Sequence, residues 1–294
     1  MPADNHIRNP FEMAVSGVGA AMSDAGRALA EARPRSAASV ETPAVRRIEA
    51  QDVMDALRRG AADVGAARDD VLFIALIYPL AGVLIASVAL DNRLTPLVFP
   101  LVSGFALLGP LAAVGLYEIS RRLERGGPIS AGTPLAVFRS PAIGDILRLG
   151  AVLLAVFFAW LVAAWAIYAA NFGPQPPVSV AAFANEVLTT PAGWRMMAVG
   201  IGVGALFAAA VFVLSVISFP LMLDRHVPMS TAVQTSLRAV RTSPKTMALW
   251  GLIIAGLLVL GSLPALVGLV FVMPLLGHAS WHLYRKVTRE GPAA

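Results

Sequence analysis

Three apolar runs that each close on a Pro-Leu pair constrain this chain more than any other feature. The pairs are Pro110-Leu111, Pro220-Leu221 and Pro274-Leu275, and each leads into a group of charged residues. The runs are about 20 residues or longer, which is enough to cross the roughly 30 Å hydrocarbon core of a bilayer. We therefore predict an all-α, polytopic membrane protein.

Composition excludes a soluble globule. Hydrophobic residues make up 57% of the 294-residue chain, charged residues make up only 14%, and the mean hydropathy is +0.72. A soluble domain is usually about 45–50% apolar and about 25% charged. The chain has no cysteine, so disulfides, thiolate metal sites and iron–sulfur clusters are excluded.

The Pro-Leu helices form part of a repeat. Tyr117 and Trp281 both stand at the seventh position after a proline, and Glu118 and His282 both stand at the eighth. Each Pro-Leu run follows an amphipathic segment and a further apolar run, so we predict six transmembrane helices as three repeats of a surface helix plus a helical hairpin. A proline inside a helix removes a hydrogen bond and bends the rod, so we expect a kink at each of the three prolines.

The predicted boundaries follow from these runs. The membrane domain covers 45–287, between a disordered cytoplasmic tail at 1–44 and a short cytoplasmic tail at 288–294. Residues 171–195 are proline-rich and nearly uncharged, and we interpret them as a loop inserted in the middle repeat. The six spans are expected at about 71–90, 95–118, 146–170, 196–222, 246–261 and 264–284.

Three amphipathic segments are predicted to be helices that lie on the membrane surface. The segment 47–66 has Arg58 and Arg59 opposite an apolar stripe, which consists of Val53, Met54, Leu57, Ala61 and Val64. In 130–141, Pro134 suits a first helical position with Thr133 as the cap. The stripe of the segment 227–242 consists of Met229, Val233, Leu237 and Val240.

The distribution of basic residues predicts the orientation, because lysine and arginine resist translocation. The short outer connections carry only Arg93 and Arg195 of the 23 Lys and Arg residues, and the other 21 fall toward the opposite side. An even number of spans with both termini in the cytoplasm fits every connection.

Ionisable residues are absent from the apolar cores of the spans, which argues against an ion-coupled transporter. They gather instead where the Pro-Leu helices reach the cytoplasm. His278 and His282 are four residues apart, so both imidazoles can point the same way, and Glu118 or Asp224 could complete a divalent-metal site with them. We favour the interpretation that these side chains anchor helix ends, and we expect no metal, no cofactor and no catalytic residue. The arginines beside them suit anionic lipid headgroups.

Three stretches carry a resemblance to a known family: GPLAAVGLYEISRRLERG, FPLMLDRHVPMSTAVQTSLRAV and VMPLLGHASWHLYR. They resemble the bacterial domain-of-unknown-function 2189 family of integral membrane proteins, and the likeness covers about residues 45–287. Members are often labelled as a cytochrome c oxidase subunit, although the family has no established reaction and implies no catalytic residue. This chain has only four histidines, one of them in the tail, so the resemblance implies at most an accessory or assembly role.

These observations lead to one expectation and two alternatives. We expect a non-catalytic accessory, assembly or lipid-organising protein of the bacterial cytoplasmic (inner) membrane, linked to a respiratory oxidase if the label applies. Its expected partners are membrane lipids, including anionic headgroups at the cytoplasmic face, and a membrane protein, but no nucleic acid. The alternatives are a channel or transporter for a hydrophobic or lipid-like solute, and a metal-dependent membrane enzyme.

Overall fold

The computed structural model describes residues 43–66, 80–89, 94–130, 132–264 and 266–288. Helices make up 83% of these residues, and no strand occurs among them. The predicted all-α class is therefore confirmed for the described part of the chain.

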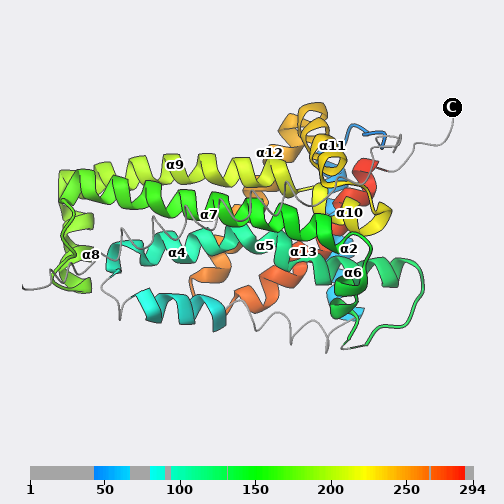
Figure 1. Cartoon of the computed structure of the whole chain (residues 1–294), viewed down its shortest axis with the longest axis horizontal. Helices are drawn as coiled ribbons and strands as arrows, with labels where there is room; N and C mark the ends of the chain where they lie inside the picture. The colour runs from blue at the N-terminus through cyan, green and yellow to red at the C-terminus, as the bar shows by residue number, and fades with distance from the viewer. Residues whose placement is uncertain (1–42, 67–79, 90–93, 131, 265, 289–294) are drawn as a thin grey trace, which may run out of the picture.

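The helices form a long bundle with a compact end (Figure 1). The long helices α7 and α9 run side by side, α8 lies across one end, and α2, α6, α10 and α11 gather at the other. The elements in chain order are α2 (Ala50–Ala66), a short helix (Leu80–Ala89), η1 (Thr95–Leu97), α4 (Val98–Phe105), η2 (Ala106–Leu108), α5 (Gly109–Ala112), α6 (Val114–Glu124), η3 (Pro134–Arg139), α7 (Ile143–Phe172), α8 (Val180–Thr189), α9 (Pro191–Ser215), α10 (Ser218–Arg225), α11 (Met229–Thr242), α12 (Pro244–Ser262) and α13 (Leu269–Thr288).

Four helical segments are long and apolar enough to cross a membrane. In three of them most of the apolar stretch is not buried inside the protein, and the buried share falls to 17% in α12, whereas it reaches 56% in Pro191–Arg225. Because so large an apolar surface is unfavourable in water, it is suited to lipid. The four segments are Thr95–Glu124, Ile143–Phe172, Pro191–Arg225 and Pro244–Ser262.

These four segments correspond to the second to fifth predicted spans. Most of the first predicted span lies outside the described residues, which include only its helix Leu80–Ala89. The sixth predicted span corresponds to α13. This helix is not among the four that are apolar enough to cross a membrane, because its second half carries histidine, arginine and lysine. The six-span repeat therefore stays a prediction. The predicted tails at 1–44 and 288–294 lie outside the described residues except at their inner edges.

Two of the three Pro-Leu pairs follow an interruption in the regular helix. At Ala106, four residues before Pro110, α4 gives way to the 3₁₀ turn η2, and the helix that contains Pro220 separates from α9 at 216–217. Proline lacks an N–H and crowds the carbonyl four residues earlier, so the irregularity falls at that distance. In contrast, α13 continues through Pro274 without a break.

The three predicted surface segments are helical, as α2, η3 and α11, but the faces buried by α2 and α11 differ from the predicted stripes. Met54 and Ala61 are exposed on α2, which instead buries Val53, Ala56 and Gly60. The predicted stripe of α11 is only half-buried, and the residues that it buries are Ala232, Thr235, Ser236 and Ala239. Small residues allow a neighbouring helix to come close. The side of each helix that packs against the protein is therefore the side that carries its small residues.

One local prediction is confirmed in position only, and another is wrong. Thr133 stands at the N-cap position before Pro134, but its hydroxyl accepts the N–H of Ser130 and makes no capping hydrogen bond to η3. The connection 171–195, which was expected to be a loop, contains α8, because the Ser179 hydroxyl accepts the N–H of Ala182 and starts a helix there.

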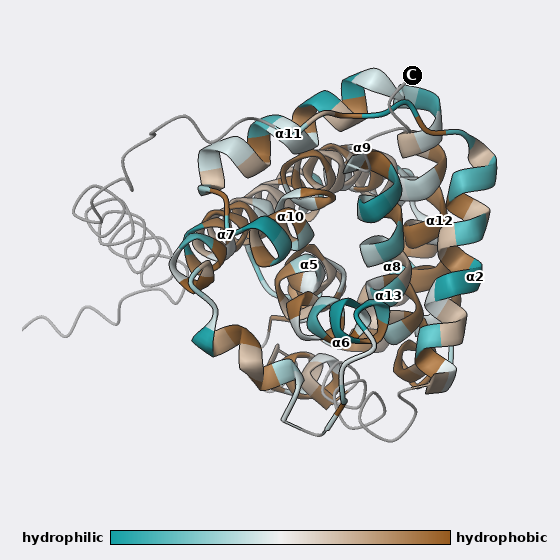
Figure 2. Cartoon of the chain, turned by 90° about the vertical axis from the view of Figure 1, so that its right-hand side faces the viewer, coloured by the Kyte–Doolittle hydropathy of each residue, from teal (hydrophilic) through white to brown (hydrophobic). Residues whose placement is uncertain are grey.

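The most deeply buried aromatic side chains come from α10, α12 and α13. Phe219, Trp250, Trp281 and Tyr284 are each 0% exposed. Around this core, α2 and α11 lie on the rim of the same end (Figure 2). The packed core is therefore at the polar end of the protein, while the apolar helices that extend away from it are largely lipid-exposed.

Candidate functional site at the joint of α2, α6 and α13

The most extensive contact between any two described elements joins α2 to α13. A β-carbon at Gly60 would lie 2.6 Å from the backbone nitrogen of Ala279, so the two backbones are in direct contact. The residues that follow the helical spacing of this face are Val53, Ala56, Gly60 and Asp63. The close approach brings the Asp63 carboxylate against α13.

Asp63 lies beside both histidines of α13. Its Oδ2 is 2.8 Å from Nε2 of His282 and 3.8 Å from Nδ1 of His278. The His278 side chain is fully buried, while those of His282 and Asp63 are 11% and 14% exposed. The two imidazoles share one face of α13, as their spacing predicts, and the acid that they meet comes from α2.

Ser120 of α6 completes what we call the polar cluster, which consists of Asp63, Ser120, His278 and His282. The Ser120 hydroxyl donates to Oδ2 of Asp63 and lies 2.7 Å from Nδ1 of His278. A hydroxyl has one proton, so Nδ1 of His278 must donate to Ser120 in this arrangement. In a neutral imidazole the bare nitrogen is then Nε2, which is buried without a hydrogen-bond partner among the described residues.

The electrostatics of the polar cluster favour an ionised Asp63. Burial by itself would raise the pKa of Asp63, but hydrogen bonds from His282 and Ser120 and the nearby imidazoles outweigh it and hold the pKa below its usual value. The cluster therefore joins three helices around one carboxylate.

The hydrogen-bond pattern of the polar cluster differs from that of a hydrolytic triad. In a triad, one imidazole nitrogen bonds to the serine hydroxyl and the other bonds to the acid. Here Nδ1 of His278 faces both Ser120 and Asp63. Ser120 is also 0% exposed, so a substrate has no access to its hydroxyl. This geometry suits a structural role, in which the hydrogen bonds hold the three helices together.

The structure does not bring the other two candidate ligands to the histidine pair. Glu118 pairs with Arg121 and Arg122 on its own helix, at 2.6 Å and 2.9 Å. Asp224 pairs with Arg125 and Arg285. Within the described ranges, no group of three or more His, Asp or Glu side chains is arranged to hold a metal ion. Sequence reasoning missed Asp63 because it considered only the Pro-Leu helices, although Asp63 follows the helical spacing of the small residues on α2.

Ion pairs cross-link the same end of the protein. Asp224 of α10 accepts hydrogen bonds from Arg125 of α6 and from both Tyr284 and Arg285 of α13. Nζ of Lys286 lies 3.1 Å from carboxylates of both Asp52 and Asp55 on α2. Most of the basic residues near the histidine pair are therefore neutralised inside the protein, so the expectation that they serve anionic lipid lacks support at these positions.

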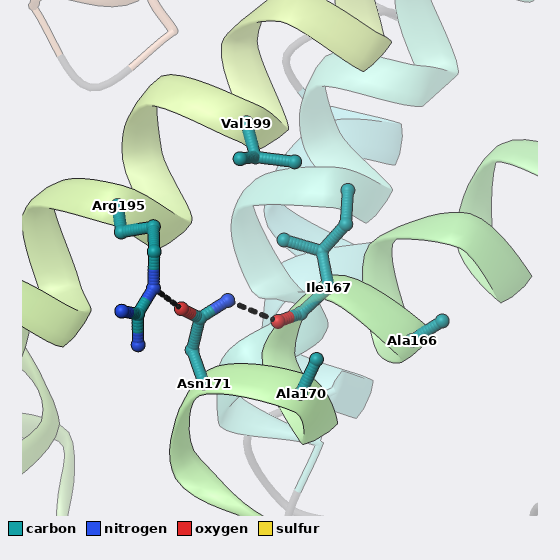
Figure 3. Close-up of a pocket in the computed structure, with 6 residues that line it drawn as sticks. All are labelled: Ala166, Ile167, Ala170, Asn171, Arg195 and Val199. Atoms are coloured by element: carbon teal, nitrogen blue, oxygen red, sulfur yellow. Dashed lines mark hydrogen bonds between the residues drawn. The ribbon is translucent and has the colours of Figure 1, made fainter.

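A shallow hollow of about 440 Å³ lies between α7 and α9 (Figure 3). The Nε of Arg195 donates to Oδ1 of Asn171 at 2.8 Å, and the amide of Asn171 donates to the carbonyl of Ile167 at 2.7 Å. Arg195 and Asn171 therefore bond to each other and to the protein backbone, the remaining lining side chains are apolar, and we assign no ligand to this hollow.

The segment from α4 to α10 carries two Pro-Leu pairs, three of the four membrane-spanning candidates and the buried Ser120. Residues 98–224 match the family model DUF2189, a predicted integral membrane protein. The match is narrower than the expected 45–287, and it leaves out α2 and α13, which supply the other three members of the polar cluster. Neither a curated protein nor a solved structure matches the chain. The DUF2189 match supports an integral membrane protein and names no activity.

Proposed function

We propose that this chain is a non-catalytic accessory or lipid-organising protein of the bacterial cytoplasmic (inner) membrane. The observation that carries the proposal is the closure of the polar cluster. Its serine is inaccessible, and its one carboxylate is shared between Ser120 and the histidines of α13. Polar side chains at this end hold helices together. None of those described lies in an open cleft with the hydrogen-bond arrangement of a known catalytic site.

The topology that accompanies this proposal has six spans and both termini in the cytoplasm. Four helices of sufficient length support it, as does the apolar helix Leu80–Ala89 before them. The 21-to-2 distribution of Lys and Arg supports the orientation. The oxidase link stays a prediction, because the DUF2189 description names no reaction.

Complementation of a deletion strain tests the proposal. Membranes of the strain would be compared by quantitative mass spectrometry of phospholipids and membrane proteins, with wild-type protein or Ser120→Ala restored at matched abundance. We expect the deletion to change this composition and both proteins to restore it equally, because the hydroxyl serves packing alone. A normally inserted Ser120→Ala protein that fails to restore would indicate catalysis, and an unchanged composition in the deletion strain would reject an accessory or lipid-organising role.

A further inference from the structure

The arginines and lysines at the compact end differ in whether they form ion pairs. Those on α6 and α13, such as Arg122 and Arg285, form ion pairs with carboxylates. A second group lies where α11 ends, where α12 begins and just before α2, and it forms no ion pair within the described residues. We call this group the basic patch, and it consists of Arg47, Arg238, Arg241 and Lys245, all of them exposed.

The basic patch has little local negative charge. Residues 225–288, which include all of α11, α12 and α13, contain no Asp or Glu. The nearest acid in sequence is Glu49, which is exposed beside Arg47. Four cations against one local acid leave a net positive surface, which attracts anions.

Hydrogen bonds bring the distant Arg47 to the other three cations. The N–H of Ile48 donates to the hydroxyl of Ser243 at 3.0 Å, and the hydroxyl of Thr246 donates to the carbonyl of Ile48 at 3.0 Å. The backbone of Ile48 therefore lies against the first turn of α12, which also carries Lys245. In agreement, α12 contacts both α2 and α11, which lie on the rim in Figure 2.

The position of the basic patch identifies the counter-charge. Lys245 lies in the first turn of the membrane-spanning helix α12, and Leu252, seven residues later, is 71% exposed. At about 1.5 Å of rise per residue, roughly 10 Å separates the cation from this lipid-facing leucine. An α12 that spans the bilayer would therefore bring Lys245 to the depth of the phospholipid headgroups.

We propose that the basic patch binds the phosphate groups of anionic phospholipids where α12 enters the membrane. This inference rests on the proposed function, because it names the partner of a lipid-organising membrane protein. Each cation near an anionic leaflet contributes electrostatic attraction, and the guanidinium groups of Arg238 and Arg241 can bind phosphate oxygens in pairs.

The test uses the full chain in neutral detergent and measures the shift in melting temperature on titration with phosphatidylglycerol, phosphatidylcholine or inorganic phosphate. Bound lipid stabilises the folded state according to its concentration and affinity. We expect phosphatidylglycerol to stabilise the wild type more than the other two do. The triple variant Arg238→Gln/Arg241→Gln/Lys245→Gln should bind phosphatidylglycerol at least about tenfold more weakly, since each cation is worth several-fold.

A charge-matched control separates a site from overall charge. The triple variant Arg58→Gln/Arg59→Gln/Arg139→Gln removes three exposed cations outside the basic patch and should bind nearly as the wild type does. Equal weakening in both variants would reject the site, and equal stabilisation by inorganic phosphate would reject lipid as its source. If the patch variant melts early without lipid, the single variant Lys245→Gln replaces it. Complementation by Ser120→Ala is independent of these outcomes, so the two proposals fail separately.

Discussion

The hydroxyl of Ser236 on α11 donates to the backbone carbonyl of Val213 on α9 at 2.7 Å. The same hydroxyl accepts the N–H of Ile217 at 3.3 Å. In an unbroken helix that N–H would donate directly to Val213, so Ser236 is inserted into the helical hydrogen bonds. An inserted side chain opens a helix, and here it does so just before Pro220. The insertion fastens α11 to the break between α9 and α10.

Ser236→Ala should destabilise the protein, because it removes a partner from two buried backbone groups. We expect the free energy of unfolding to fall by about 1–3 kcal/mol, measured by thermal or denaturant unfolding in detergent. Ser230→Ala alters an exposed serine on the same helix and should have little effect. Equal stabilities of the two variants would show that the insertion contributes nothing.

Gly60→Val should separate α2 from α13. A β-carbon at this position would meet the backbone of Ala279 at 2.6 Å, and neither backbone can move away without disrupting the packing. Overpacking of this kind costs about 1–3 kcal/mol, and hydrogen exchange of the α2 amides should become faster. The control is Gly65→Ala, where an added β-carbon meets nothing within 4 Å. Unchanged α2 protection in Gly60→Val would contradict the close packing.

Asp63 should make stability depend on acid pH. Its folded pKa lies below the ordinary value of 3.8, so the stability that it contributes is fully present above that value and is lost as pH falls through the folded pKa. Asp63→Asn should therefore melt earlier than the wild type near neutral pH and lose less stability on acidification below about pH 4. Melting curves across this range test the prediction. Glu49→Gln, which alters an exposed acid outside the polar cluster, should retain the wild-type profile.

His282→Ala should leave the metal content unchanged but destabilise the protein. The substitution removes a partner 2.8 Å from the Asp63 carboxylate, and a poorly paired carboxylate of low exposure is costly by about 1–3 kcal/mol. Elemental analysis of purified protein checks the first outcome and unfolding checks the second. Stoichiometric zinc, iron or copper that disappears in the variant would favour the enzyme alternative.

Reporter fusions should place the loops at 119–145 and 223–245 in the cytoplasm and the segment 171–195 outside. The expectation follows from the positions of Lys and Arg, of which only Arg93 and Arg195 belong to the outer connections. Fusions in α8 are the most decisive, because this helix lies at the end of the bundle opposite α2 and α11 (Figure 1). A cytoplasmic signal from α8 would contradict both the number of spans and the repeat.

The sequence predicted the class of the protein and the positions of its helices well, because both depend on local properties. Length and hydropathy place α7 and α12 within about three residues of the predicted bounds, whereas α9 both begins and ends several residues before its predicted span of 196–222. The charge distribution likewise locates the polar end. Amphipathic spacing identified α2 and α11 as helices, but it did not indicate which side of each helix packs against the protein, since an apolar side chain such as Met54 suits lipid as well as protein.

Contacts between distant segments were decided only by the tertiary structure. The spacing of His278 and His282 set their common face, but nothing local indicated that Asp63, more than 200 residues earlier, would lie between α2 and that face. The approach depends on Gly60 meeting Ala279, a steric relation between two helices that hydropathy does not encode. For the same reason, sequence alone could count the arginines but could not separate those paired with carboxylates from those that form no ion pair within the described residues. Local composition fixes which segments are helical and apolar, whereas the fit of small residues between helices decides which charges meet.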